Sequence, residues 1–199
     1  MSEIRIPTQK RSIEKKDKIV EKGFELMCEN GYFNTSTNDI AKYAGVSTGI
    51  IYQYFNDKKE IFIEGVKNYS DTIMFPILDI LKNNNLKFDN LDTLLDKLLD
   101  SFINKHTLSK KAHEEMMALS HLVEDIAQIF HNKEMVTTKK IVEVLEKNKI
   151  DSNNLIEKVH IIIGIVENYC HEIVYHKHTS LNYNFMKQEV INVITNILK

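Results

Sequence analysis

The sequence predicts an all-α protein of about nine helices, and three observations lead to that prediction. The 199 residues include only two prolines and six glycines, the residue types that most often interrupt a helix. Apolar residues recur at the spacing of one helical face in most segments, and no segment alternates as a half-buried strand does. Residues 36–58 also have the pattern of two short helices joined by a tight turn.

The N-terminal part begins with residues 1–9, which have no periodic pattern and which we expect to form a flexible basic arm. The first helix is predicted over residues 10–30, and Gly31 follows as its end. Phe33 is expected to fill the core of the first three helices, against Ile40 and Phe55.

The stretch from 36 to 58 carries the clearest local signals. Ser36 is a natural N-cap, and Asp39 three residues later makes an acidic variant of the capping box. Gly45 is expected to end this helix, because glycine reaches the left-handed conformation of a sharp C-terminal turn. Ser47 is then predicted to cap a second helix over 48–55, with Ile51 facing inward.

The rest of the chain is predicted to be helical, with loops at Pro76 and at Asn83 to Asn85. Ser109 is expected to cap one of these helices. Residues 155–176 are apolar around much of the helix, so this helix should be buried on more than one side. The predicted ranges are 58–75, a short segment 76–81, 91–105, 109–131, 133–149, 155–176 and 183–198.

A glycine-containing turn between two helices also fits an ordinary helical corner, but the wider pattern resembles the TetR family of transcriptional regulators. The resemblance covers roughly residues 12–65. One departure is that residues 48–55 contain no Lys or Arg. The resemblance rests on Gly31-Tyr32, Thr35-Ser36-Thr37, Asp39-Ile40-Ala41, Ala44-Gly45-Val46-Ser47, Gly49, Tyr52, Tyr54-Phe55 and Lys58-Lys59-Glu60-Ile61.

This resemblance implies a helix-turn-helix DNA-binding domain over residues 10–56 and a ligand-binding and dimerisation domain over 57–199. It further implies a homodimeric repressor that binds a palindromic DNA operator and is released by a small-molecule effector. The fourth helix is expected to link the two domains, because Lys58 at its start would lie at the DNA.

The starts of the helices at 36, 47 and 57 are candidate phosphate sites, because helix N-termini carry free N–H groups and partial positive charge. The resemblance implies that Thr37, Tyr54 and Lys58 contact phosphate. Ser36 and Ser47 have a second interpretation, in which their hydroxyls only cap helices.

The candidate base-reading residues lie on the second helix and at the start of the helix before it. They are Asn38, Thr48, Gly49, Ile50, Tyr52 and Gln53. Amide side chains pair with adenine, and an apolar side chain suits the thymine methyl group, so we expect half-sites rich in A·T. Ile50 instead fits core packing, and Tyr52 instead fits support against the first helix.

The C-terminal part is expected to dimerise through its last two helices, where apolar surface exceeds what one chain can bury. Candidate ligand-binding residues are Met116, Met117, His121, Phe130, Tyr169 and Tyr175, although each also fits simple core packing. No histidine or cysteine spacing predicts a metal site, and no cofactor or catalytic residue is expected.

The formal net charge of −2 does not indicate a nucleic-acid ligand, but basic residues gather before the helix-turn-helix. Cys28 and Cys170 lie far apart, and neither a signal peptide nor a membrane span is evident, so we expect a soluble cytoplasmic protein. Two rival functions stay open: a metal-assisted hydrolase using histidines with Glu114, Glu167 and Glu172, and a sensor that acts through protein partners.

Overall fold

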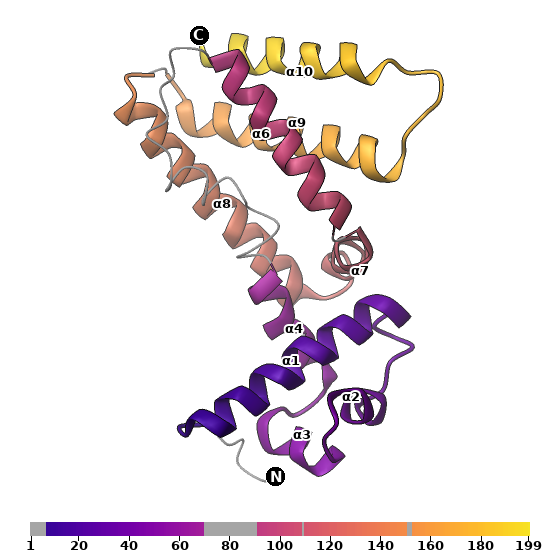
Figure 1. The fold of residues 1–199 in the computed structure, drawn as a ribbon. Helices are drawn as coiled ribbons and strands as arrows, with labels where there is room; N and C mark the ends of the chain where they lie inside the picture. Colours follow the sequence, from indigo (N-terminus) through magenta and orange to yellow (C-terminus); the bar gives the residue numbers. More distant parts are fainter. Residues whose placement is uncertain (1–6, 70–90, 109, 151–152) are drawn as a thin grey trace. The chain divides into compact units, whose positions relative to one another are not determined.

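The computed structural model describes residues 7–69, 91–108, 110–150 and 153–199. Within these ranges the chain forms nine helices and no strand, as predicted (Figure 1). None of the described helices is both long and apolar enough to cross a membrane. The helices are α1 (Lys10–Asn30), α2 (Thr37–Ala44), α3 (Thr48–Tyr54), α4 (Lys58–Tyr69), α6 (Leu91–Leu108), α7 (Lys110–Ser120), α8 (Glu124–Lys147), α9 (Leu155–Tyr175) and α10 (Tyr183–Leu198).

The chain divides into two compact units. The first contains Met1–Ser70 and Lys111–Ile129, and the second contains Asp71–Lys110 and Phe130–Lys199. The predicted break at Pro76, the segments 76–81 and 83–85, the cap at Ser109 and the end of the fourth helix lie outside the described residues. The predicted functional boundary between 56 and 57 stays a prediction.

The first unit is built on α1, which packs against α2 and α4, while α2 packs against α3. Its core contains fully buried side chains from each of these helices, among them Met27, Ile40, Ile51 and Phe62. α1 and α4 approach closely at Gly65, where an added Cβ would lie 2.5 Å from the Phe24 ring. The two short helices α2 and α3 therefore share one core with α1 and α4.

The prediction for Phe33 is wrong, because its side chain is 68% exposed. Gly31 turns the chain with φ of +89°, and the ring that follows it inward is Tyr32. Tyr32 is partly buried and meets the Phe62 ring edge-on, with 5.4 Å between centroids. The sequence has two adjacent aromatic residues here, and the turn geometry decides which one packs.

The predicted break between the helices 109–131 and 133–149 is also wrong, because the chain breaks earlier, between Ser120 and Glu124. The chain turns at residues 121–123, where the N–H groups of Leu122 and Val123 both donate to Leu119 O, and α8 then runs unbroken to Lys147. Neither place has a glycine or proline to mark a break. The acidic pair Glu124 and Asp125 at the start of α8 suits the positive end of a helix.

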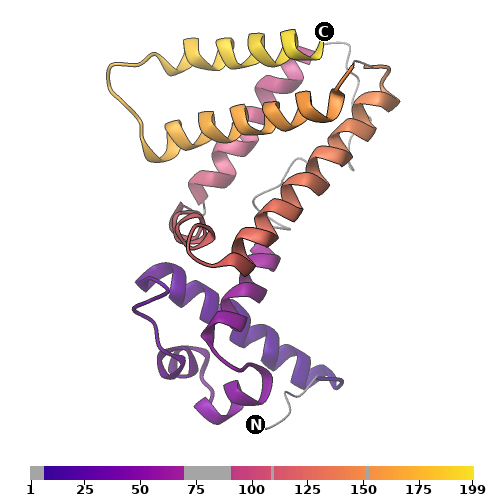
Figure 2. The same cartoon turned by 180° about the vertical axis from the view of Figure 1, so that it is seen from behind.

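The second unit packs α6 against α9 and α10, and α9 against α10. Figure 2 shows α9 and α10 running side by side and joined by one loop. The core of the second unit includes the buried residues Leu99 on α6, Leu145 on α8, Val159 on α9 and Ile194 on α10. This core comes from the apolar faces that the helical spacing predicts.

Candidate nucleic-acid interface and ligand cavity

The predicted capping box at the start of α2 is confirmed. The Asp39 N–H donates to Ser36 Oγ over 3.2 Å, and the Ser36 N–H donates to the Asp39 carboxylate over 3.0 Å. The Ser36 hydroxyl also donates to the Asp39 carboxylate over 2.5 Å. This bond, followed by the one from the Ser36 N–H, lowers the pKa of Asp39. Thr37 is the first residue of α2 and is partly buried.

The turn between α2 and α3 is also as predicted. Gly45 has φ of 69° and ψ of 37°, in the left-handed region that side chains rarely adopt. The Val46 N–H donates to Ala41 O over 2.9 Å, which closes the end of α2. The turn therefore fixes the angle at which α3 leaves.

The two short helices are tied by a further bond that links two predicted base-reading residues. Thr48 Oγ1 donates to Asn38 Oδ1 over 2.8 Å. This bond leaves the Asn38 amide N–H groups able to donate outward, and the oxygen keeps a second lone pair. Asn38 is exposed. The bond to Thr48 therefore holds a solvent-accessible amide group in one orientation before any DNA binds.

Ser47 occupies the N-cap position of α3, but its side chain makes no capping hydrogen bond. The prediction that its hydroxyl caps the helix is therefore wrong, and the backbone Ser47 O instead accepts from the Ile50 N–H over 3.0 Å. The side chain is exposed. The structure thus removes capping as the alternative use of this hydroxyl.

α3 separates into an inner and an outer face. Ile51 is fully buried, and Tyr54 is only 5% exposed. Gly49, Gln53 and the 48% exposed Tyr52 form the outer face, and Thr48 and Ile50 are partly buried beside them. The core interpretation of Ile50 and the phosphate contact of Tyr54 stay open, but the Tyr54 ring belongs to the inner face.

Lys58, at the start of α4, has a role that sequence reasoning missed. Its Nζ donates to Tyr32 O over 2.6 Å and to Thr35 O over 2.7 Å, and it lies 4.5 Å from the centre of the Tyr32 ring. The lysine thereby ties α4 to the turn that leads into α2. An ammonium has three N–H donors, so a third is left for a phosphate.

The second unit contains a cavity of about 100 Å³. The described residues of its walls come from α6, α8, α9 and α10, and they are apolar except for Thr137 and Glu167. None of the six residues predicted to bind ligand lines it. Met116, Met117 and His121 belong to the first unit, and Phe130, Tyr169 and Tyr175 lie elsewhere in the second. Their assignment stays a prediction.

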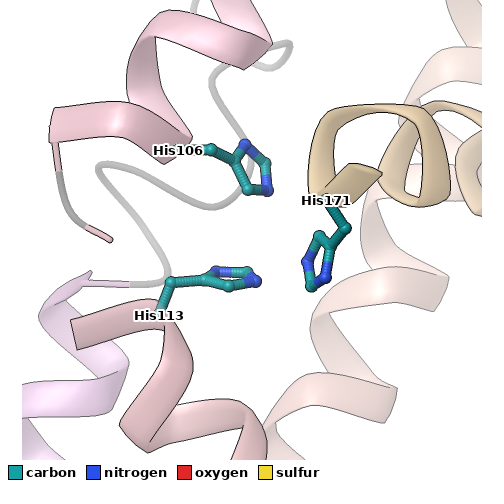
Figure 3. A group of neighbouring side chains, drawn as sticks. All are labelled: His106, His113 and His171. Atoms are coloured by element: carbon teal, nitrogen blue, oxygen red, sulfur yellow. The ribbon is translucent and has the colours of Figure 1, made fainter. Parts of the chain in front are cut away.

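Glu167 on α9 pairs with two histidines of the second unit, His106 on α6 and His171 on α9. Figure 3 shows the rings of these two histidines. Glu167 Oε2 lies 3.3 Å from His106 Nε2 and 3.9 Å from His171 Nε2. His106 Nδ1 lies 2.9 Å from Phe102 O, so this nitrogen carries the donated proton. Figure 3 also labels His113, which belongs to the first unit.

The two histidines titrate differently. Burial by itself lowers the pKa of His106, but the hydrogen bond and the charge of Glu167 outweigh it, and the pKa is raised. Burial lowers the pKa of His171, and the charge of Glu167 offsets that only in part. His106 is therefore the partner that holds a proton opposite the carboxylate.

The capped α2, the glycine turn and the outer face of α3 together have the geometry of a helix-turn-helix domain, the kind of domain that places its second helix in a DNA groove. The sequence pattern of "Bacterial regulatory proteins, tetR family" matches residues 19–64. Residues 19–64 are therefore similar to the N-terminal region that defines this family.

Two curated relatives match part of the chain. The HTH-type transcriptional regulator HbdR of Aromatoleum sp. (strain CIB) is 44% identical over 59 residues, which are 30% of this chain and 26% of the relative. The biofilm operon icaADBC HTH-type negative transcriptional regulator IcaR of Staphylococcus aureus (strain Newman) is 32% identical over 88 residues, 43% of this chain and 44% of IcaR. The chain thus spans less than half the length of either relative.

Solved structures share the fold of the whole chain. Salmonella enterica GusR superposes with a TM-score of 0.69 at 15% identity, over 94% of this chain and 96% of GusR. A TetR-family transcriptional regulator from Streptomyces coelicolor gives a TM-score of 0.69 at 13% identity, over 93% of this chain and 80% of that chain. At such identities the likeness concerns the fold alone.

Proposed function

We propose that the protein is a one-component transcriptional repressor that binds a palindromic operator as a homodimer and leaves it when a small molecule binds in the second unit. The observation that carries the proposal is the helix-turn-helix with a preorganised outer face on α3. The name of IcaR, a negative regulator, supports repression as the direction of control.

In this proposal α3 lies in the major groove and its outer face reads base edges. Gly49 brings the backbone close to the duplex, and Gln53 and Asn38 provide amide groups for adenine. Ser36, Thr37, Ser47, Tyr54 and Lys58 are the proposed phosphate contacts. The outer face lacks the arginine or lysine that binds guanine most often, so half-sites should be rich in A·T.

Selection of bound sequences from a random DNA pool tests this reading directly. We expect paired half-sites, with A·T at the central positions of each half. Gln53→Ala should relax the preference at one base pair, worth about 1–3 kcal/mol, while affinity for nonspecific DNA stays unchanged as the internal control. Enrichment of G at the central positions would refute the A·T reading, and recovery of no sequence at all would favour a sensor of protein partners.

The proposed dimer interface is the outer face of α9 and α10. Ile161 and Phe185 are 56% and 63% exposed on these helices. Gly164 is open, because an added Cβ would meet nothing within 4 Å. Exposed apolar side chains gathered on two adjacent helices mark an interaction surface, and a two-fold axis would pair it with its own copy as a four-helix arrangement.

Ile161→Glu should convert the dimer to a monomer, which analytical ultracentrifugation measures. Val136→Glu on α8 is the matched control, since Val136 is also apolar and 45% exposed but lies off the proposed interface. A dimer that survives Ile161→Glu and dissociates with Val136→Glu would place the interface elsewhere.

Ligand binding in the second unit must change the DNA-binding helices of the first. We propose that α8 transmits this change, together with α4, which the sequence predicts to link the two domains. Asp125 near its start pairs with Lys59 of the first unit over 2.5 Å. Thr137 and Val144, further along the same helix, line the cavity of the second unit. A ligand releases DNA only if it prefers one arrangement of the dimer, and a coupling of about 1–3 kcal/mol lowers operator affinity roughly 5–150-fold.

A further inference from the structure

The chemistry of the cavity in the second unit narrows the class of molecule that it accepts. Its walls are built from hydrocarbon side chains such as Leu98, Phe102, Val144 and Ile163. Apolar walls gain from apolar contact and offer charged groups nothing in return for lost hydration. The body of a suitable ligand is therefore a hydrocarbon.

Thr137 is the one neutral polar residue among the described residues that line the cavity. Its side chain is 1% exposed, and its Oγ1 has no hydrogen-bond partner among the described residues. A buried hydroxyl without a partner is unfavourable, so a ligand group that bonds to it would remove an existing penalty as well as form a bond. A threonine hydroxyl both donates and accepts, which suits a hydroxyl on the ligand.

Among the described residues that line the wall, Glu167 is the only ionisable one, and it disfavours anions. Its carboxylate is already engaged by His106 and His171, so a ligand need not neutralise it. In the part of the chain that the structure describes, no lysine or arginine lines the cavity to receive a carboxylate or phosphate. An anionic ligand would meet like charge in an apolar surrounding.

The volume limits the size of the ligand. A dry apolar cavity of about 150 Å³ in another protein holds one benzene ring. A cavity of about 100 Å³ thus matches a single small ring or a short chain.

We propose that the effector is an uncharged, largely hydrocarbon molecule of about one ring, carrying one hydroxyl that hydrogen-bonds to Thr137 Oγ1. The assignment of this ligand as effector rests on the proposed regulatory function, but its binding does not.

Three probes of similar size separate the parts of this proposal: benzyl alcohol, toluene and benzoate at neutral pH. Ligand-observed NMR on the full chain should show that benzyl alcohol binds at least about tenfold more tightly than benzoate. Thr137→Val keeps the shape and removes the hydroxyl, so it should weaken benzyl alcohol about fivefold, the loss of one hydrogen bond of ~1 kcal/mol, and leave toluene unchanged. Val144→Phe should fill the cavity and abolish both neutral probes.

Thermal unfolding of each variant checks that it folds. If Val144→Phe does not fold, the comparison of the probes in Thr137→Val still tests the proposal. Benzoate binding as tightly as benzyl alcohol would overturn the charge assignment. Equal losses of toluene and benzyl alcohol in Thr137→Val would overturn the hydrogen bond, and binding that persists in folded Val144→Phe would overturn the location. Operator affinity is measured separately: if benzyl alcohol binds as expected and operator affinity is unchanged, the site stands and its role as the effector site fails.

Discussion

Removing the ammonium of Lys58 should lower both the free energy of unfolding of the protein and its proposed affinity for DNA. The substitution Lys58→Met keeps most of the aliphatic stem and deletes the charge. In the structure Nζ donates to two backbone carbonyls, Tyr32 O at 2.6 Å and Thr35 O at 2.7 Å. Thr35 is 2% exposed, so water does not easily replace the lost bond.

The size of the effect follows from these contacts. A hydrogen bond from a charged donor contributes ~1.5–3 kcal/mol, and partly exposed pairs lie at the low end of that range. Two such bonds give an expected stability loss of about 2–3 kcal/mol. If the third N–H also contacts a phosphate, the slope of log K against log salt becomes shallower by about 0.9.

Urea unfolding measures the first quantity, and fluorescence anisotropy of a labelled operator over a range of salt concentrations measures the second. Lys59→Met is the matched control, because it removes the same charge one residue away. Lys59 pairs with Asp125 in an exposed ion pair, and such pairs contribute little. The control should leave the salt slope unchanged.

The two readouts can fail separately. An unchanged salt slope in Lys58→Met would remove this lysine from the DNA interface. A stability loss below about 0.5 kcal/mol would mean that the bonds to the turn contribute nothing, against the values expected for charged donors.

Three further predictions concern stability. Ser36→Ala should cost ~1 kcal/mol in urea unfolding through loss of the capping bond, and Ser36→Thr should restore most of it. Gly65→Ala should destabilise by ~1–3 kcal/mol in thermal or urea unfolding, because the new Cβ would lie 2.5 Å from Phe24. The raised pKa of His106 means that its charged form stabilises the fold below the ordinary histidine pKa and that this stability is lost as pH rises through the folded value. His106→Gln should therefore cost more stability at about pH 5.5 than at about pH 8.5, and an equal cost at both would contradict the pairing.

The sequence alone determined the helical class and the local geometry of the helix-turn-helix. Ser36, Asp39 and Gly45 act on backbone groups within a few residues of themselves, so their effects can be read from the residue type and its spacing. The inward face of α6 follows from the same reasoning, because side chains at helical spacing must share a face. On α8 the same reasoning is wrong for Val136, which the spacing places inward and which is 45% exposed. These predictions needed no knowledge of distant parts of the chain.

The tertiary structure decided two features for which the local sequence offers similar alternatives: which aromatic residue packs after Gly31, and where the chain breaks before α8. Phe33 and Tyr32 are adjacent aromatic residues, and only the turn at Gly31 selects Tyr32 for packing. The break before Glu124 has no glycine or proline to announce it. In both places the local conformational preferences of the alternatives are too similar to decide between them, so packing against distant parts of the chain decides.

The contacts that give the site its chemistry also come from the tertiary structure. Lys58 bonds to carbonyls 26 and 23 residues earlier, and His106 meets Glu167 across 61 residues. The cavity beside Glu167 is made from four helices, whose residues looked like ordinary core positions in the sequence. Periodicity tells which face of a helix is buried, but the space left between buried faces depends on how the side chains of separate helices fit together.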